Sequence, residues 1–380
     1  MRPRGATKAR LETVTESADS RWTHAGHGRP ESAEPPPTTT AIAVGMQLPA
    51  GFAAIAEDDV LGPAITTSMA RVEKVLREAI SNSDPLADAT SRHLMEAGGK
   101  RIRPLLTILA SHLGDPERAE VLQAAAVVEL THLATLYHDD VMDSAPYRRG
   151  APTAHEVWGN TVAILAGDLI FARASILVSD LGGRALAIQA RTFERLCLGQ
   201  LHETVGPREG EDPVAHYISV LADKTGSLIA ASGQFGVIFS GAPAEFESVL
   251  VEYGEKVGVA FQLADDVIDV TGGRASSGKI AGTDLREGVP TLPVLLLRQA
   301  AADGDASAAR VVALVDGDLT DDDALAEAVE ALAAHPATEQ AWAVARDWAD
   351  AAKAALEPLP AGVVKDSLAA FADAVVERQA

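Results

Sequence analysis

The 380-residue chain has very little cysteine and few aromatic residues. Cys197 is its single cysteine, which excludes an intramolecular disulfide framework and fits a reducing cytoplasm. Aromatic residues make up only 4% of the chain, and alternating runs of β-branched residues are scarce. Alanine, leucine, valine and glutamate dominate instead, which is typical of a mostly helical protein. We therefore expect an all-α fold and a cytoplasmic location.

Positive charge and long apolar runs are also in short supply. The 32 lysines and arginines are outnumbered by 54 aspartates and glutamates, and the formal net charge is −22. Because phosphate backbones select for basic faces, this balance argues against nucleic acid as a partner. No uninterrupted apolar run approaches the roughly 18 residues of a membrane span, and the N-terminus lacks the apolar core of a signal peptide. The sequence predicts a soluble intracellular protein.

The chain divides into two regions of different composition. Residues 1–45 are rich in arginine, serine, threonine and proline and show no helical period. This composition predicts a disordered N-terminal tail, and Met46 is an alternative start site. Residues 46–380 form the structured part. Length alone suggests two or three domains, but the apolar pattern from Asp58 onward never clearly breaks.

The apolar pattern predicts a series of helices in the structured part. Glycine and proline breaks separate them, and several are apolar on nearly every face, which is typical of the interior of a large bundle. From Asp303 onward, alanine- and aspartate-rich segments with solvated faces predict an outer C-terminal layer. The clearest helices span residues 60–80, 105–113, 117–143, 161–181, 228–241 and 245–270.

One acidic motif occurs twice, as DDVMD from Asp139 and as DDVID from Asp265. In each copy the first and last aspartates lie at i and i+4, on one face of a helix end. Such carboxylates repel one another by roughly a few tenths of a kcal/mol per pair, so they favour a bound cation. Carboxylates without histidine or cysteine indicate Mg²⁺, which also binds phosphate oxygens. The candidate metal ligands are Asp139, Asp140, Asp143, Asp265, Asp266 and Asp269.

The scarce basic residues gather near these acids in the sequence. A single DDxxD is usually a solvated helix end, and a single lysine or arginine is usually a surface cation. Two complete acidic motifs with cations beside both instead indicate two anionic groups, one bound through metal and one bound directly. The basic positions are Lys100, Arg101 and Arg103 in GGKRIRP, Arg148 and Arg149 after the first motif, Lys224 with Thr225 before a helix, and Lys279 after the second motif.

The order of these motifs resembles that of the trans-isoprenyl diphosphate synthases, the polyprenyl synthetase family. GGKxxRP, HDDxxD, RRG, KT, FQxxDDxxD and GK follow one another within residues 58–380. The resemblance implies an all-α fold, a single large helical bundle around a deep central cavity, and a homodimer. It implies an enzyme that condenses isopentenyl diphosphate with an allylic diphosphate, with two or three Mg²⁺ ions in each active site.

The resemblance also implies a role for each motif position. Isopentenyl diphosphate would be held by Lys100, Arg103, His132 and Arg149. The allylic diphosphate would meet Arg148, and its ionising carbon and leaving group would be surrounded by Lys224, Thr225, Gln262 and Lys279. The Mg²⁺ ligands would be Asp139 and Asp143, supported by Asp140, and Asp265, with Asp266 and Asp269 nearby or bound through water.

The expected chemistry needs no nucleophilic side chain. Departure of diphosphate from an allylic carbon builds negative charge on the leaving group, which metal ions and cationic side chains stabilise. Cys197 lies in an apolar helical segment and is expected in the core. A lone histidine on an apolar helix is more often packed than functional. We interpret His132 as functional because it matches the family, and His138 as a structural hydrogen-bonding residue beside the metals.

Product length in the family depends on side chains that precede the first acidic motif. Bulky aromatic residues four and five positions before its first aspartate stop growth early, whereas Thr135 and Ala134 are small. Thr131 and Leu130, one turn earlier, are not aromatic either, and Tyr137 should point elsewhere on the helix. We expect a long all-trans product in the hepta- to nonaprenyl range, used for a menaquinone side chain, with transient membrane contact for its release.

One position departs from the short-chain pattern, and three alternatives stay open. Val289 in LREGVPTLP occupies the place of a second lysine, which long-chain members often lack, and Arg286 is a candidate to supply the charge. A geranylgeranyl or other medium-chain synthase is the main alternative. A class I terpene cyclase mixes Asn, Ser or Thr with Glu in its second metal motif, and a non-catalytic partner subunit typically lacks metal ligands. The two intact motifs argue against both.

Overall fold

A computed structural model describes residues 52, 55, 58–272 and 281–377. The chain divides into two units, Met1–Gly45 and Met46–Ala380, and the described residues belong to the second. The predicted disordered tail, the alternative start and Lys279 lie outside the described residues.

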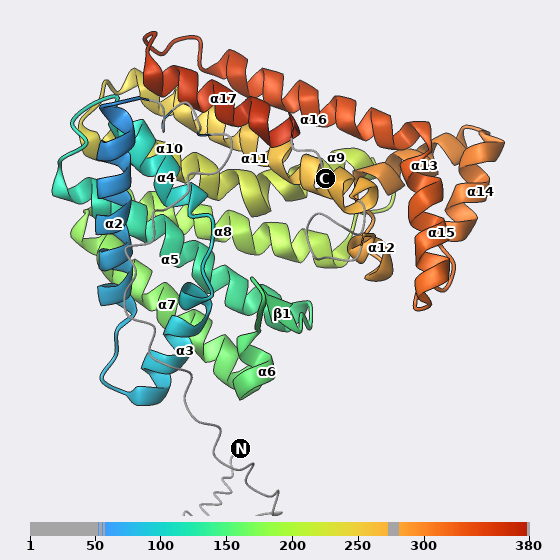
Figure 1. Ribbon diagram of the computed structural model, residues 1–380, viewed down its shortest axis with the longest axis horizontal. Helices are drawn as coiled ribbons and strands as arrows, with labels where there is room; N and C mark the ends of the chain where they lie inside the picture. Colours follow the sequence, from blue (N-terminus) through green and yellow to red (C-terminus); the bar gives the residue numbers. More distant parts are fainter. Residues whose placement is uncertain (1–51, 53–54, 56–57, 273–280, 378–380) are drawn as a thin grey trace, which may run out of the picture. The chain divides into compact units, whose positions relative to one another are not determined.

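The described part is built almost entirely of helices (Figure 1), which confirms the predicted all-α fold. Two short strands, β1 (Tyr147–Arg148) and β2 (Ala151–Pro152), form an antiparallel hairpin. The helices of the first half are α2 (Leu61–Ile80), α3 (Pro85–Glu96), α4 (Ile102–Ser111), α5 (Ala119–Met142), α6 (Ala154–Trp158), α7 (Asn160–Asp180) and α8 (Gly183–Val205). Those of the second half are α9 (Pro213–Leu221), η2 (Ala222–Gly226), α10 (Ser227–Ser240), α11 (Glu245–Thr271), α12 (Thr283–Arg286), α13 (Leu292–Ala302), α14 (Ala306–Val315), α15 (Asp322–Ala333), α16 (Pro336–Ala355) and α17 (Val363–Glu377).

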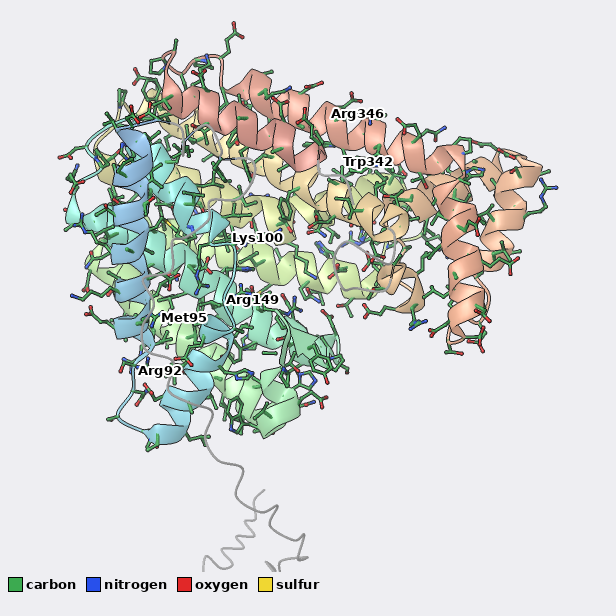
Figure 2. All side chains as sticks on the ribbon, viewed as in Figure 1. Arg92, Met95, Lys100, Arg149, Trp342 and Arg346 are labelled. Carbon is green, nitrogen blue, oxygen red and sulfur yellow. The ribbon has the colours of Figure 1, made fainter. Side chains whose placement is uncertain are left out.

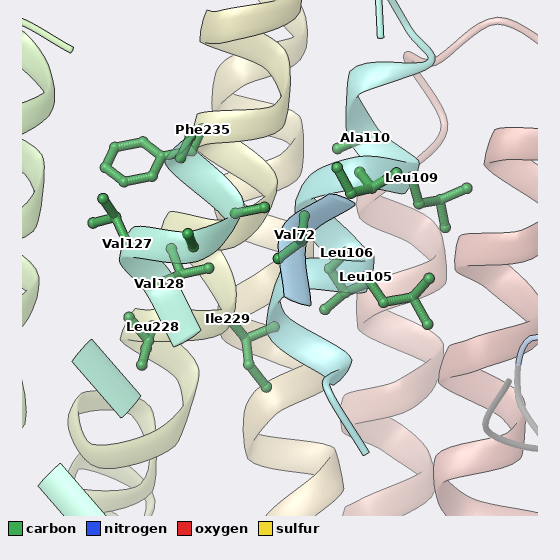
Figure 3. Close-up of a cluster of buried hydrophobic side chains, with 14 of the residues drawn as sticks. Val72, Leu105, Leu106, Leu109, Ala110, Val127, Val128, Leu228, Ile229 and Phe235 are labelled. Atoms are coloured by element: carbon green, nitrogen blue, oxygen red, sulfur yellow. The ribbon is translucent and has the colours of Figure 1, made fainter. Parts of the chain in front are cut away.

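The main core is built around α5, α10 and α11. Figure 3 shows side chains of α2, α4, α5 and α10 packed together in this core. Glycines on α10 and α11 allow close helix contacts, because a Cβ at Gly236 would lie 2.5 Å from the Thr107 carbonyl oxygen of α4. Likewise, a Cβ at Gly254 of α11 would lie 2.5 Å from Ala230 Cα of α10. The helix that follows the KT motif is therefore held tightly against the helix that carries the second acidic motif.

The C-terminal helices form two groups. Helices α16 and α17 lie along α11 (Figure 1), while α13, α14 and α15 enclose a second, smaller apolar cluster that includes Leu297 and Leu325. The outer layer predicted after Asp303 fits α14 and α15, which have many exposed residues. It does not fit α16, because Ala341 and Ala349 are buried where α16 packs on α11.

Helices α7 and α8 expose apolar side chains that the sequence had predicted to be interior. Ile164, Leu165 and Ile176 of α7 are exposed, and so is Cys197 of α8. The prediction that Cys197 is a core residue is therefore wrong, and α7 is an apolar helix that is only partly interior. An apolar helix face is typically packed against another protein surface. The sequence pattern does not indicate whether that surface belongs to the same chain or to a second one.

Helices α5 and α7 are long and apolar enough to cross a membrane by length and composition, although charged residues such as Glu129 in α5 and Asp168 in α7 interrupt both apolar runs. The most apolar window of α5 is 67% buried inside the unit, and that of α7 is 33% buried. The burial of α5 identifies it as a core helix of this fold. The exposed apolar surface of α7 extends onto α8, because Ile164 of α7 and Cys197 of α8 line the same groove.

Candidate active site

The first acidic motif lies at the C-terminal end of α5. The backbone N–H of Asp143 donates to the Asp139 carbonyl oxygen at 2.8 Å, so the two residues follow one another by one helical turn. Both line a cavity of about 600 Å³. Burial and the charge of Asp143 raise the pKa of Asp139 to about 6, although Lys224 opposes the shift. A cation bound between the carboxylates would relieve this repulsion.

Asp140 is buried beside the hairpin that follows the motif. Its carboxylate accepts a hydrogen bond from Arg148 Nε. Arg149 and Gly150 have φ of 54° and 78°, as the two-residue turn of a tight hairpin requires. Arg148 and Arg149 line the same cavity as Asp139. Asp140 thus holds the hairpin through Arg148 with Oδ1, and its predicted role as a metal ligand would fall to its second carboxylate oxygen.

The loop that contains GGKRIRP forms the opposite wall of this cavity. Arg101 has a left-handed backbone, with φ of 49°, and its buried guanidinium donates to Glu73 at 2.6 Å and to Glu129 at 2.7 Å. These bonds fix the loop to α2 and α5. A Cβ at Gly99 would lie 2.8 Å from the guanidinium carbon of Arg149, so glycine is required for Arg149 to lie against the end of α3 (Figure 2).

Several cations crowd the cavity, and one has an unused donor. Arg103 Nε is buried and has no hydrogen-bond partner in the described part of the chain. Burial and nearby Arg149 lower the pKa of Arg103 to about 10. Burial and the surrounding arginines also lower the pKa of His132 well below its usual value, so its imidazole is neutral and can donate one hydrogen bond. With Lys100 on the same wall, these donors match an anion with several oxygens.

The second acidic motif lies in the last turns of α11 and faces a neighbouring cavity of about 740 Å³. Asp143 of the first motif and Asp266 of the second both line this cavity, so the two motifs share one space. Asp266 is buried, which raises its pKa well above the usual range, and it accepts a hydrogen bond from the Tyr217 hydroxyl at 2.6 Å. Asp265 is half-buried next to it, and the Asp269 carboxylate accepts a backbone N–H of α12 at 3.2 Å.

Lys224 and Thr225 lie between the two cavities on the π-helical turn η2, which interrupts the helix formed by α9 and α10. Both residues line both cavities, as does Gln262 of α11. Lys224 Nζ contacts Glu203 Oε2 at 2.5 Å, and the Thr225 hydroxyl lies 3.5 Å from Gln262 Oε1. Single π turns inside helices are frequent at functional sites, because they redirect the side chains they carry.

The donors at the acidic end fit a hard divalent cation. All six candidate ligands are carboxylates, and oxygen ligands are the preference of such ions. Within the described residues, no three acidic, histidine or cysteine groups converge closely enough to hold an ion alone. Oxygens of a bound ligand would therefore complete the coordination.

Comparison with known proteins assigns the chain to a family. A sequence profile of the polyprenyl synthetase family matches residues 84–332. The chain belongs to the polyprenyl synthetase family. A nonaprenyl diphosphate synthase of Mycobacterium tuberculosis strain H37Rv is 46% identical over 323 residues, which cover 84% of this chain and 95% of that relative. The family makes the chain a prenyltransferase, a trans-polyprenyl diphosphate synthase.

Solved structures of this family support the same fold and the binding of divalent metal. A polyprenyl synthase from Caulobacter crescentus CB15, complexed with calcium and isoprenyl diphosphate, superposes with a TM-score of 0.77 at 33% identity over 87% of this chain and 98% of that one. A geranylgeranyl pyrophosphate synthase from Corynebacterium glutamicum, with the same ligands, gives 0.75 at 41% identity over 84% and 98%.

An apolar cavity of about 530 Å³ opens beside the acids of this polyprenyl diphosphate synthase. Asp139 and Lys224 lie at its polar end, and its walls come from α5, α7 and α8. Phe193, Leu196 and Leu201 supply much of the apolar lining on α8. A hydrocarbon chain attached to a diphosphate at the acids would therefore have an apolar path to follow.

Of the predicted chain-length positions, Thr135 lines the apolar cavity. Ala134 and Thr131 are buried on α5 and are not among the described residues that line the apolar cavity. An aromatic pair not predicted from the sequence instead joins α7 and α8 beside this cavity. The rings of Phe171 and Phe193 stack with centroids 3.9 Å apart, and Phe193 forms part of the wall.

Tyr137 and His138 lie where the sequence placed them. The Tyr137 hydroxyl donates to the Thr90 carbonyl oxygen at 2.5 Å and accepts the Leu94 N–H at 3.1 Å, so the ring points toward α3. His138 Nε2 lies 3.2 Å from the Ile164 carbonyl oxygen of α7, which is a structural contact beside the first motif.

Arg286 is not among the described residues that line the cavity of the second acidic motif, and its role as a replacement for the missing lysine stays a prediction. Arg286 Nη2 contacts Asp322 Oδ1 of α15 at 2.5 Å, while Val289 lines the second cavity. No sequence motif pointed to Glu203 or Tyr217, although both line that cavity. Tyr217 lies two helical turns before Lys224, and this spacing is the one signal that could have linked it to the site.

Proposed function

We propose that this chain condenses isopentenyl diphosphate with an allylic diphosphate to give an all-trans polyprenyl diphosphate in the hepta- to nonaprenyl range, using two or three Mg²⁺ ions. The observation that carries the proposal is the pair of adjoining cavities. One is lined by carboxylates of both motifs, and the other by a cluster of cations. One diphosphate would bind through metal and the other directly to basic side chains.

Isopentenyl diphosphate would occupy the cation-lined cavity. Arg103 and Arg149 offer planar guanidinium donors, Lys100 adds charge, and neutral His132 donates one hydrogen bond. Thr225 also lines this cavity and marks the side where the adjoining cavity begins. The double bond of the bound substrate would therefore face the allylic carbon.

The allylic diphosphate would lie between the acidic motifs. Mg²⁺, when bound, would neutralise negative charge on the leaving diphosphate. Lys224 would add a positive charge after releasing Glu203, and Thr225 and Gln262 would direct their dipoles at the carbon that becomes cationic. The remaining contacts we propose are metal ligation by Asp139, Asp143 and Asp265, with Asp140, Asp266 and Asp269 in supporting positions, and contacts of Arg148 and Lys279 with the leaving group.

The reaction would then proceed through a carbocation. The allylic C–O bond breaks, and both its electrons leave with the diphosphate. The isopentenyl double bond attacks the cation and forms the new C–C bond. Loss of a proton to the released diphosphate restores a double bond, and the elongated allylic diphosphate can enter another cycle.

Product length is proposed from the apolar cavity. Thr135 leaves its entrance open, whereas an aromatic side chain there would block a growing chain close to the acids. The nonaprenyl diphosphate synthase of M. tuberculosis, at 46% identity, favours a long product. The geranylgeranyl pyrophosphate synthase of C. glutamicum, at 41%, keeps a medium-chain product as the alternative. A long product would suit a menaquinone side chain.

The proposal includes a homodimer in the cytoplasm. Helices α7 and α8 expose several apolar side chains, of which Ile164, Cys197 and Leu201 line one groove. The others are Leu165, Ile176, Leu186 and Leu198. A second copy packed against these two helices by two-fold symmetry would remove these side chains from water. We expect the long apolar product to leave through transient membrane contact.

The homodimer is tested by sedimentation of the purified chain at several concentrations. We expect a dimer, and we expect Ile176→Glu to sediment as a monomer because it buries a charge in the proposed interface. Lys74→Glu, at an exposed position on α2 and therefore on neither helix of the proposed interface, is the control and should remain dimeric. A monomeric wild type would contradict the homodimer.

The reaction is tested with farnesyl diphosphate, labelled isopentenyl diphosphate and Mg²⁺. After dephosphorylation, we expect linear prenyl alcohols whose longest member fixes the product length. A cyclic hydrocarbon would indicate a terpene cyclase, and no incorporation would indicate a partner subunit without activity of its own. A product that stops at geranylgeranyl would establish the medium-chain alternative.

A further inference from the structure

The π turn that carries Lys224 and Thr225 is wedged between two other helices of the site. On one side it rests on α8, because a Cβ at Gly199 would lie 2.9 Å from the Lys224 backbone nitrogen. On the other side it rests on α11, because a Cβ at Gly226 would lie 3.0 Å from the Glu255 carbonyl oxygen. At these contacts the backbones meet without side chains between them. The turn can therefore change its direction only if a neighbouring helix moves.

Arg195 of α8 joins the three elements at this point. Its guanidinium donates through Nε to Asp223 Oδ1 of the turn at 2.7 Å, and through Nη1 to Glu255 Oε1 of α11 at 2.5 Å. Nη2 lies 3.4 Å from the carbonyl oxygen of Ala222, the same oxygen that accepts the Ser227 N–H across the π turn. One planar cation therefore contacts the beginning of the turn and the helix behind it.

Arg195 acts from outside the site. It is not among the described residues that line the three cavities, whereas Lys224 lines all three and Thr225 lines the two polar ones. Glu255 lies two helical turns before Gln262, the partner of Thr225 on α11. The clamp thus connects the backbone of Lys224 and Thr225 to the helix that carries Gln262 and the second acidic motif.

We propose that Arg195 is a positioning residue for the prenyl transfer: it sets the direction of the π turn, and so aims Lys224 and Thr225 at the departing allylic diphosphate. This inference rests on the proposed function. The ion pairs are half-exposed, with Arg195 at 35% and Glu255 at 38% side-chain exposure, so they contribute only about 0.2–1 kcal/mol each to folding. Their main consequence is geometric, and loss of the clamp should lower the rate rather than unfold the chain.

The chain supplies a matched control on the same helix. Arg184 of α8 also pairs with a glutamate of α11, with Nη2 2.5 Å from Glu247 Oε2. Unlike Arg195, this arginine is paired with α11 alone among the contacts seen in the described residues, and makes none with the π turn. Arg184→Met therefore removes a bond between the same two helices and leaves the turn untouched.

The test compares Arg195→Met and Arg184→Met in steady-state prenyl transfer. Misplacing a catalytic group by about 1 Å can cost a hundredfold, so we expect Arg195→Met to lower kcat by about ten- to a hundredfold. The KM for isopentenyl diphosphate should change less than about twofold, because Lys100, Arg103 and Arg149 would hold its diphosphate. Arg184→Met should keep wild-type kcat and KM. Arg195→Lys should not restore the rate, because one ammonium cannot make the same planar set of bonds.

Three results would overturn the inference. The first is a wild-type kcat in Arg195→Met, the second an equal loss in Arg184→Met, and the third a loss of kcat matched by an equal rise in KM for isopentenyl diphosphate. Asp223→Asn, which keeps the shape of the turn but weakens the clamp, should lower kcat in the same selective way and replaces Arg195→Met if that variant does not fold. A wild-type chain that makes no prenyl product would refute the proposed function, whereas an active wild type with an equally active Arg195→Met would refute the clamp alone.

Discussion

The two ends of the active site oppose one another in charge. The wall formed by the GGKRIRP loop and the hairpin presents cations, one of which has a buried Nε without a partner in the described residues. The ends of α5 and α11 present carboxylates, and burial raises the pKa values of Asp139 and Asp266. Both ends would take a diphosphate. In the proposed function, this difference in charge would let one end bind a diphosphate directly and the other end bind it through metal.

The largest expected effect is at the carboxylate end. Asp139→Asn keeps the size of the side chain but removes the charge that would bind metal, so kcat should fall by about a hundred- to a thousandfold. Binding of isopentenyl diphosphate, measured by calorimetry, should stay within about twofold. Asp180→Asn, an exposed aspartate at the end of α7, should leave both quantities unchanged. Equal loss of rate and of isopentenyl diphosphate affinity would erase the distinction between the two ends.

A smaller effect of opposite kind is expected at the cationic end. Arg103→Met removes a charged donor, and hydrogen bonds to charged groups contribute about 1.5–3 kcal/mol. The KM for isopentenyl diphosphate should therefore rise about ten- to a hundredfold, with the dependence of the rate on Mg²⁺ concentration unchanged. Arg71→Met, at a half-exposed ion pair on α2, is the control. A shift in the Mg²⁺ requirement of Arg103→Met would contradict a direct, metal-independent contact.

The apolar cavity begins at the carboxylate end, and changes there should alter product length with little loss of turnover. Thr135→Phe places an aromatic ring at the entrance and should shorten the longest prenyl alcohol to the farnesyl or geranylgeranyl stage. Phe193→Ala opens the wall where Phe171 and Phe193 stack and should lengthen the product. Chromatography of the dephosphorylated products measures both. An unchanged product from Thr135→Phe would show that the chain grows along another path.

The smallest effect concerns His132 and stability. Burial and the nearby arginines lower its folded pKa, while the unfolded chain protonates near 6.5. The unfolded state therefore takes up a proton that the folded state does not, and stability falls as pH drops below 6.5, by at most about 1.4 kcal/mol per pH unit. His132→Gln should lose this part of the acid dependence. Urea unfolding between pH 7.5 and 5.5 measures it, and parallel curves for the two proteins would contradict a neutral His132.

The sequence predicted the all-α fold, the helix positions and the acidic and basic motifs, because helical spacing and local charge are properties of short segments. It could not predict the pairings that cross between elements. The bond that ties Asp140 to Arg148, the pairing of Arg286 with Asp322 and the clamp of Arg195 depend on how distant helices pack.

Burial was also beyond the reach of the sequence in places. Cys197 and Ile176 lie in segments as apolar as those of the core, yet both are exposed on the described chain. The sequence shows that a helix face is apolar. Whether that face is buried depends on how the helices pack and on any neighbouring chain. The π turn of η2 likewise has no signature in the letters ADKTG, because one extra residue per turn is set by packing against α8 and α11.

The most direct test of two differently charged diphosphate sites is calorimetric titration with and without metal. Isopentenyl diphosphate and an unreactive thiolo analogue of farnesyl diphosphate are each titrated into the protein, once in excess chelator and once in Mg²⁺. We predict that isopentenyl diphosphate binds in both conditions with similar affinity, whereas the allylic analogue binds only when Mg²⁺ is present. Binding of the allylic analogue in chelator, or a strict metal requirement for isopentenyl diphosphate, would contradict the account.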